Sequence, residues 1–132
     1  MMDRGDDTMG FQDDWMLRQI ESIAQFVARV VFQKSEVHYE IENSEMYTHL
    51  DKLYLTLEHL IEEGLLGEAE DMLFDQIEYT DKFTQLATDF YTRLNALSNE
   101  ELAAGNFSRD EVYDGYIEIL AMLGIPIEQF KL

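Results

Sequence analysis

Hydrophobic residues recur at intervals of three and four through most of the chain, and this spacing places side chains on one face of an α-helix. The pattern is widest between residues 13 and 32, where a helix is predicted to start at Asp13 or Asp14 and to end near Phe32. Its inner face is formed by Met16, Ile20, Ile23, Val27 and Val30. Other apolar side chains widen this face and leave only a thin polar line, formed by Arg18, Glu21, Gln25 and Arg29.

A helix at the surface of a soluble domain is polar over roughly half of its girth. The helix of residues 13–32 is apolar over far more of its girth than that. It is therefore predicted to be covered on two or three sides, either by other helices of the same chain or by a second copy of the chain in a homodimer.

The same spacing predicts a helical hairpin in the middle of the chain. Its first helix is capped by Asn43 or Ser44 and ends at Gly64, because glycine readily adopts the left-handed turn that closes many helices. The inward residues of this helix are Met46, Leu50, Leu53, Leu57, Leu60 and Ile61. The second helix starts at Gly67 or Glu68, and its inward residues are Ala69, Leu73 and Ile77.

A further apolar seam follows the hairpin and predicts another helix. Its residues are Phe83, Leu86, Ala87, Phe90, Leu94 and Leu97. Thr80 and Asp81 can begin a separate helix at this point. Because Thr80 also fits the seam, a single kinked helix that joins this segment to the preceding one is the alternative.

Two capping boxes predict the last helices. In SNEE, which starts at Ser98, and SRDE, which starts at Ser108, the serine and the glutamate three residues later each accept a hydrogen bond from a free backbone N–H. The first of these helices ends near Gly105, and the second is stopped by Gly124 and Pro126. The second helix buries Val112, Tyr116, Ile119, Leu120 and Leu123. The sequence thus predicts an all-α fold, a compact bundle of about five to six helices.

Residues 36–42, EVHYEIE, alternate with a period of two, which is typical of an extended strand. No second strand is predicted for this segment to pair with. We therefore expect an extended connector that lays Val37, Tyr39 and Ile41 onto the helices. Pairing with the same segment of a second copy is the alternative.

A single helical domain is predicted over residues 13–132, after a flexible acidic leader at residues 1–12 that has no apolar periodicity. The leader lacks the charged-then-apolar pattern of a secretory signal. The longest apolar stretch is shorter than the about 20 residues that cross a bilayer. The chain has no cysteine, which fits a reducing compartment. We expect a soluble, cytoplasmic protein that binds no membrane.

The chain carries 28 Asp and Glu against nine Lys and Arg, a formal net charge of −19. From Glu36 to Asp81 there are 14 acids and a single base, Lys52, so this segment alone contributes −13. Such a field repels phosphate backbones and anionic lipids, which argues against nucleic-acid and membrane binding. Solubility accounts for the charge, and a functional acidic surface is the alternative.

The sequence carries no recognisable catalytic motif: it has no glycine-rich phosphate loop and no G-x-S-x-G. Three histidines lie in the acidic segment: His38, His49 and His59. None has the glutamate three residues earlier that di-iron bundles use. Glu45 with His49, or His59 with Glu62 or Glu63, forms either an ordinary helix-face pair or two ligands of a metal ion. We predict no catalytic, cofactor-binding or metal-binding residue.

The middle hairpin resembles a tetratricopeptide repeat. The spacing of that motif's large, turn and small residues is matched by Leu53, Leu60, Gly64, Ala69 and Leu73. The motif's other small residues and its proline are replaced by Thr56, Leu57, Gln76 and Asp81. No second copy occurs at a period near 34, so the resemblance implies one repeat-like hairpin inside a bundle.

Segments along nearly the whole chain resemble one family of small uncharacterised proteins from low-GC Gram-positive bacteria, classed as a domain of unknown function. They are DWMLRQIESIAQFVARVVF, LIEEGLLGEAEDMLFDQIE and DFYTRLNALSNEEL with NFSRDEVYDGYIEILAMLGI. The resemblance implies a helical fold. It supplies no activity, cofactor or site residue.

These observations favour a non-enzymatic helical interaction module, an adaptor or a self-associating protein, whose protein partner is unknown. The apolar girth of the helix over residues 13–32 is the main reason. Tyr54 and Tyr91 lie beside apolar seams, where an aromatic ring either packs at the core boundary or lines a peptide groove. The alternatives are a small-molecule or metal-binding enzyme that uses the acidic, histidine-bearing hairpin, and an acidic mimic of nucleic acid.

Overall fold

The computed structural model describes residues 3–130 of the chain, with side chains from Asp13 onward. These residues form six α-helices and no β-strand, which confirms the predicted all-α class. The helices are α1 (Asp3–Val31), α2 (His49–Glu62), α3 (Leu66–Asp75), α4 (Asp81–Asn95), α5 (Asn99–Ala104) and α6 (Arg109–Met122), and a short 3₁₀ turn follows, η1 (Glu128–Phe130).

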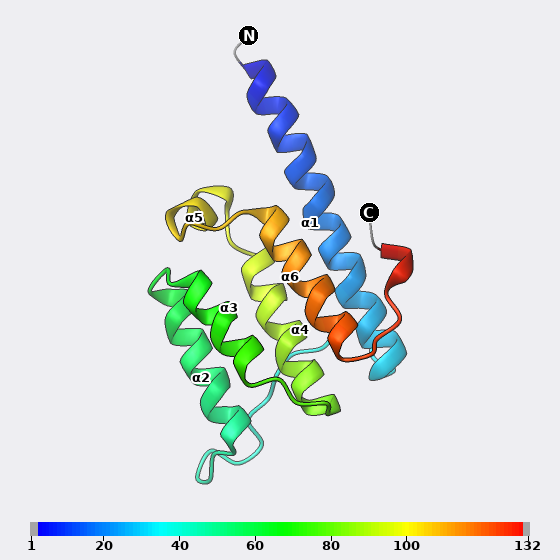
Figure 1. Cartoon of the computed structure of the whole chain (residues 1–132), viewed down its shortest axis with the longest axis vertical. Coiled ribbons are helices and arrows are strands. Elements are labelled where there is room, and N and C mark those ends of the chain that lie inside the picture. The colour runs from blue at the N-terminus through cyan, green and yellow to red at the C-terminus, as the bar shows by residue number, and fades with distance from the viewer. Residues whose placement is uncertain (1–2, 131–132) are drawn as a thin grey trace.

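The helices pack as a bundle around α4 (Figure 1). Helix α4 contacts α1, α2 and α6, while α1 also packs on α6 and α2 pairs with α3 as a hairpin. The segment after α6 returns along α1, where the ring of Phe130 meets that of Phe26 edge to face at a centroid distance of 5.5 Å. The predicted compact bundle of five to six helices is confirmed.

The broad apolar surface of α1 is covered by helices of its own chain, α4 and α6. Its predicted inner residues Met16, Ile20, Ile23 and Val27 are at most 5% exposed, and the predicted polar line is exposed. Val30 was predicted to point inward, but it is 50% exposed. In the last turns of α1 the buried face runs through Val27, Ala28 and Val31, and Val30 points to one side of that face.

Helix α1 begins at Asp3, well before the predicted start at Asp13 or Asp14. Extending an existing helix costs little, because each added residue gains a hydrogen bond without a new nucleation step. The backbone of residues 3–12 is therefore helical where an irregular leader was predicted. The side chains of residues 1–12 and all of residues 1–2 lie outside the described part, and the flexibility of the leader stays a prediction.

Helix α2 starts later than predicted. Its cap is Thr48 rather than Asn43 or Ser44, because the Thr48 side chain accepts from the Asp51 N–H while the Asp51 carboxylate accepts from the Thr48 N–H. Met46 therefore precedes the helix and is 73% exposed, so its predicted inward position is wrong. The other inward residues hold: Leu50, Leu53 and Leu57 are buried, and Leu60 and Ile61 are partly buried.

Helices α3 and α4 are separate, which resolves the alternative of one kinked rod. Helix α3 starts at Leu66, slightly before the predicted Gly67 or Glu68, and Ile77 lies beyond its end. Thr80 caps α4 by accepting from the Phe83 N–H at 3.1 Å. The capping boxes predicted for α5 and α6 are both present, at Ser98 and Ser108.

Two glycine stops and the connector are also as predicted. Gly64 and Gly124 have φ values of +78° and +79°, the left-handed region that favours glycine. Residues 36–41 are extended without pairing, and they bury Val37 and Tyr39 and partly bury Ile41. Among the described residues, no helix has the length and hydropathy of a membrane span.

Candidate functional site

The extended connector between α1 and α2 is bound to α4 through its own main chain. The Tyr39 N–H donates to Asp89 Oδ2 at 2.7 Å, and the Gln85 side-chain amide donates to the His38 carbonyl at 2.5 Å. The Lys82 ammonium donates to the Glu40 carbonyl at 3.1 Å. Lys82, Gln85 and Asp89 are spaced by three and four residues, so one face of α4 holds three consecutive connector residues.

The side chain of Tyr39 fastens the connector to α2 as well. Its hydroxyl donates to Asp51 Oδ1 at 2.5 Å, and its ring stacks on Tyr54 at a centroid distance of 4.8 Å. The hydrogen bonds that Asp51 accepts from the Tyr39 hydroxyl and the Thr48 amide hold the pKa of that carboxyl below its usual value. Burial and the bond to Asp51 raise the pKa of the Tyr39 hydroxyl. The carboxylate of Asp51 therefore serves both the helix cap and the connector.

Arg93 joins α4 to α2 directly, and it reaches the connector through Asp89. Its Nε donates to Asp89 Oδ1 at 2.9 Å and its Nη1 donates to Glu58 Oε2 at 3.1 Å, while Nη2 contacts the Tyr54 hydroxyl. Asp89, which is 5% exposed, thus accepts from Arg93 with one oxygen and from the Tyr39 N–H with the other. The connector, α2 and α4 are tied into one unit by this network.

Two hollows lie on either side of the connector, and together we call them the α4 trough. The first has a volume of about 410 Å³ between α1, the connector and α4; its lining residues are Ile20, Glu21, Ala24, Gln25, Ser35, Glu36, Val37, His38, Thr88, Thr92 and Asn95. The second, also about 410 Å³, lies between the connector, α2 and α4; it is lined by His38, Tyr39, Tyr54, Asp89, Thr92, Arg93 and Ala96. They share His38 and Thr92.

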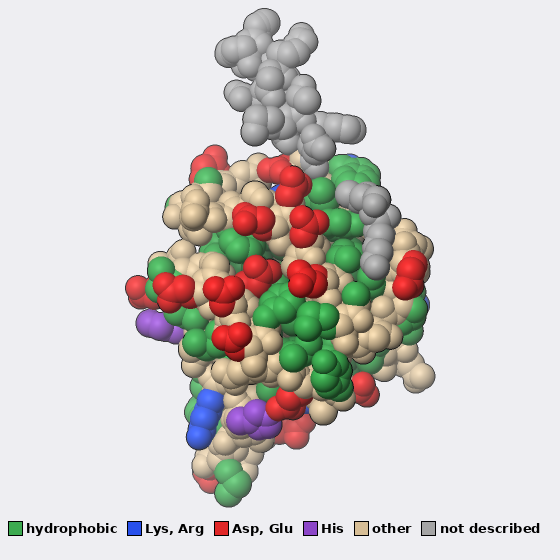
Figure 2. Space-filling model, viewed as in Figure 1, with side chains coloured by type: hydrophobic (Ala, Val, Ile, Leu, Met, Phe, Trp, Pro, Cys, Tyr) green, Lys and Arg blue, Asp and Glu red, His purple; other side chains and the backbone are tan. Residues whose placement is uncertain are grey.

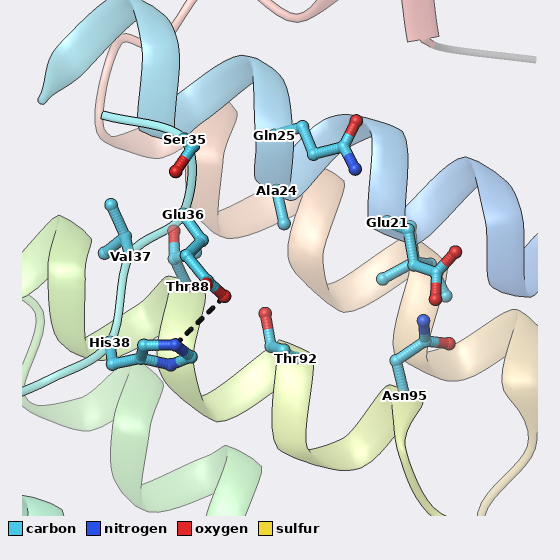
Figure 3. Close-up of a pocket in the computed structure, with 11 residues that line it drawn as sticks. Glu21, Ala24, Gln25, Ser35, Glu36, Val37, His38, Thr88, Thr92 and Asn95 are labelled. Atoms are coloured by element: carbon cyan, nitrogen blue, oxygen red, sulfur yellow. Dashed lines mark hydrogen bonds and ion pairs between the residues drawn. The ribbon is translucent and has the colours of Figure 1, made fainter. Parts of the chain in front are cut away.

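The first hollow is lined by both apolar and polar side chains (Figure 3). The apolar part of the lining comes from α1, where Ile20 is buried and Ala24 is partly buried, while the buried Val37 side chain points away from the hollow in Figure 3. The carboxylates of Glu21 and Glu36 enter from opposite ends of the hollow, with the Thr92 hydroxyl between them in this view. Such a lining offers oxygen acceptors to a donor group and a dry surface to an aliphatic chain.

The serine, glutamate and histidine at one end of this hollow do not form a hydrolytic triad. His38 Nε2 lies 3.1 Å from Glu36 Oε1, so two of the three groups are paired. The Ser35 hydroxyl stands apart from the imidazole in Figure 3 and makes no hydrogen bond to it. A nucleophile needs the base within hydrogen-bond reach, so the arrangement suits binding better than acyl transfer.

The residues that line the trough lie within a segment of the chain that matches a known protein family. Residues 10–124 match the model of DUF6483, a family of unknown function. The chain belongs to this family. The match runs through all residues that line the trough, and it confirms the resemblance to a domain of unknown function. Neither a curated protein nor a solved structure matches the chain.

The histidines of this DUF6483 protein do not form the pairs considered from the sequence. His49 is bound to Glu78, which lies between α3 and α4, rather than to Glu45. His38 pairs with Glu36. Within the part of the chain that has described side chains, no group of three or more His, Cys, Asp or Glu has the arrangement of a metal site.

A second polar surface of the DUF6483 fold lies between α3 and α6. A hollow of about 330 Å³ there is lined mainly by carboxylates, from Glu70, Asp71, Glu111, Asp114 and Glu118. Figure 2 shows red side chains gathered over these two helices. The Tyr91 hydroxyl donates to Glu70 at 2.5 Å, and burial, reinforced by neighbouring carboxylates, raises the pKa of Glu70. We call this surface the acidic groove.

The two tyrosines considered for a groove have different roles. Tyr54 lines the second hollow of the trough. Tyr91 is fully buried, so it belongs to the core. Asp51, Asp89 and Arg93 were not singled out from the sequence, although a polar row at Lys82, Gln85 and Asp89 beside an apolar seam was a readable signal.

Proposed function

We propose that this protein is a non-enzymatic interaction module that holds an extended segment of a partner protein in the α4 trough. One observation carries the proposal: the chain's own connector already lies extended across α4, held by hydrogen bonds between its main chain and helix side chains. The hollows that flank the connector continue the same surface, so a second extended segment can bind there in a similar way.

The main chain of the connector supports this proposal. Within the described residues, no main-chain to main-chain hydrogen bond is made by residues 36–42. An extended guest beside the connector gains such bonds, as in recognition modes that add a strand to an exposed edge. Apolar and polar side chains of the trough then select the guest's alternate side chains.

Helix α2 contributes Tyr54 to the second hollow, and we propose that the hairpin it forms with α3 is tetratricopeptide-like. Gly64 adopts the left-handed turn and Ala69 is fully buried where the two helices meet, as the motif requires. We also propose a bacterial, cytoplasmic setting. The absence of cysteine supports a reducing compartment, and the family resemblance supports a bacterial one.

A peptide-display selection tests the proposed function. Random peptides are selected on the immobilised protein and then compared on two variants, Thr92→Trp and Thr56→Trp. Thr92 is exposed in the middle of the trough, so the indole blocks both hollows; Thr56 is exposed on α2 outside their lining. We expect selected peptides to bind wild type and Thr56→Trp equally and to lose at least tenfold in affinity for Thr92→Trp.

Two results would overturn the proposal. The first is a selection in which no peptide distinguishes Thr92→Trp from wild type. The second is a wild-type protein that dimerises in sedimentation and becomes monomeric only in Thr92→Trp, because the occupant of the trough is then a second copy of the chain rather than another protein.

A further inference from the structure

We infer that the first hollow of the α4 trough is a specificity pocket for a lysine or arginine side chain of the bound segment. This inference rests on the proposed function and names the chemistry of its partner. Four features of the trough support it: the charge at the rim, the apolar surface of α1, the neutral acceptors and the contrast with the second hollow.

The rim of the first hollow carries two carboxylates that form no ion pair with a lysine or arginine among the described residues. Glu21 projects from α1 and Glu36 from the connector, and both carboxylates face the hollow in Figure 3. Among the described residues, neither forms an ion pair with a lysine or arginine; Glu36 pairs only with His38. In a chain of net charge −19, such a site attracts cations and repels anionic guests.

The apolar surface of α1 in this hollow fits the stem of a basic side chain. Lysine and arginine bury their methylene groups on apolar surface while the charged end stays hydrated or paired. Ile20 and Ala24 of α1 provide that surface beside the carboxylates. A purely aliphatic guest would leave the two carboxylates without a partner, and an acidic guest would meet them with like charge.

Neutral acceptors complete the rim. An ammonium has three donors and a guanidinium has five, more than two carboxylates can satisfy in one geometry. Ser35, Gln25 and Thr92 also line the hollow, and the Thr92 hydroxyl points toward it in Figure 3. Asn95 contributes less, because its side-chain oxygen already accepts from Arg109 Nη1 at 3.4 Å.

The second hollow has the opposite character, which fixes where the basic side chain binds. Arg93 lines it, and its guanidinium is already satisfied by Asp89, Glu58 and Tyr54. A basic guest side chain finds no unpaired carboxylate in this lining, because Asp89 is already bound by Arg93 and the Tyr39 N–H, whereas a neutral or aromatic side chain can pack beside the Tyr54 ring. The structure therefore assigns the basic residue of the guest to the first hollow.

The test compares peptide pools selected on three proteins: wild type, Glu21→Gln/Glu36→Gln, and the control Glu62→Gln/Glu63→Gln. The control removes the same charge from exposed positions near the end of α2, outside the trough. We expect lysine and arginine to be enriched in the pools from wild type and control and not in the pool from Glu21→Gln/Glu36→Gln. A basic wild-type peptide should lose about fivefold in affinity for that variant, in line with two solvent-exposed ion pairs.

A thermodynamic cycle separates a local contact from general electrostatics. Replacing the basic residue of the peptide by norleucine should weaken binding to wild type and should change binding to Glu21→Gln/Glu36→Gln little. The inference would be overturned if norleucine lowered the affinity equally for wild type and Glu21→Gln/Glu36→Gln. It would also be overturned if Glu62→Gln/Glu63→Gln weakened binding of the basic peptide as much as Glu21→Gln/Glu36→Gln does. Peptides that depend on Thr92 but show no basic preference would overturn the inference and leave the proposed function standing; absence of any peptide sensitive to Thr92→Trp would overturn both.

Discussion

The main-chain N–H of Tyr39 donates a 2.7 Å hydrogen bond to the carboxylate of Asp89, which lies 50 positions further along the chain. The second oxygen of Asp89 accepts from Arg93 Nε on the next turn of α4. Asp89 is 5% exposed, so both donors depend on one buried carboxylate. The connector, which forms one wall of the α4 trough, is therefore held on α4 by the Asp89 carboxylate.

Asp89→Asn is predicted to destabilise the fold and loosen the connector. Asparagine has nearly the same shape, but its amide group faces one of the two donors and leaves it buried without a partner, which costs about 2 kcal/mol. Urea unfolding followed by circular dichroism should show this loss. Glu40→Gln, at an exposed position of the same connector, should leave the free energy of unfolding within about 0.5 kcal/mol of wild type. Equal stability of the two variants would contradict the prediction.

The contact between Tyr39 and Asp89 could not be predicted from the sequence, whereas local features of the helices could. The inner faces of the helices, the caps at Ser98 and Ser108 and the turn at Gly64 are local properties, and they were predictable. Asp89 and Arg93 are four residues apart, a spacing that is common on exposed helix faces. Asp89 is buried where the connector and α2 pack on α4, and no periodicity within α4 predicts that packing.

The start of α2 was missed for a related reason. Asn43, Ser44 and Thr48 are all good cap residues, and local propensity places Asn and Ser above Thr. Thr48 is the cap because Asp51 completes a capping box and at the same time receives the Tyr39 hydroxyl. The hollows of the trough were likewise invisible, since they arise between three segments that meet only in the fold. The predicted homodimer through α1 stays a prediction, and the exposed Val30 is a residue it would use.

Tyr39→Phe is predicted to cost about 1 kcal/mol at neutral pH, since it removes the hydrogen bond to Asp51 and leaves the ring stacked on Tyr54. Tyr47→Phe, whose ring is 42% exposed, is the matched control and should be neutral. Unfolding at pH 7 compares the two. A loss from Tyr47→Phe as large as that from Tyr39→Phe would contradict a specific role of the buried hydroxyl.

The cost of Tyr39→Phe should also depend on pH. The pKa of Asp51 is lowered in the folded protein, first by the Tyr39 hydroxyl, so its ionised form contributes stability above the unfolded value of 3.8 and that contribution is lost as the pH falls through the folded pKa. Tyr39→Phe removes part of this contribution. The difference between wild type and variant should therefore be constant from pH 7 to about 5 and shrink below pH 3.8. A difference that grows on acidification would contradict the assignment.

Gly115→Ala is predicted to destabilise the contact between α3 and α6. A Cβ at this position would collide with the Glu70 carboxylate and lie 2.6 Å from the Tyr91 hydroxyl oxygen. Overpacking of this kind costs about 1–3 kcal/mol. Gly67→Ala in α3 is the matched control: a Cβ there meets no atom within 4 Å, so it should stabilise the helix by about 0.5–1 kcal/mol. Thermal unfolding should move in opposite directions for the two variants, and a common direction would contradict the close approach at Gly115.

Glu70→Gln is predicted to stabilise the protein at neutral pH. Burial, with the charges of Glu111, Asp71 and Glu118, raises the pKa of Glu70, and the hydrogen bond from Tyr91 only partly offsets this. Because the folded pKa lies above the unfolded value of 4.5, folding opposes the ionised form at pH 7 and favours the protonated form in acid. Glutamine imitates the protonated form and still accepts from the Tyr91 hydroxyl. The variant should exceed wild type by a few tenths to about 1 kcal/mol at pH 7, and the gain should vanish below about pH 4.5.

The control for Glu70→Gln is Glu68→Gln, two residues earlier on the exposed surface of α3. It removes the same formal charge from a chain of net charge −19 but breaks no buried contact. If relief of overall repulsion were the cause, both variants would gain equally and 1 M salt would abolish both gains, because screening acts within about 3 Å at that ionic strength. The local burial of Glu70 instead predicts a gain that survives salt and is absent from Glu68→Gln. A salt-sensitive gain shared by both variants would show that the acidic groove destabilises the fold only through net charge.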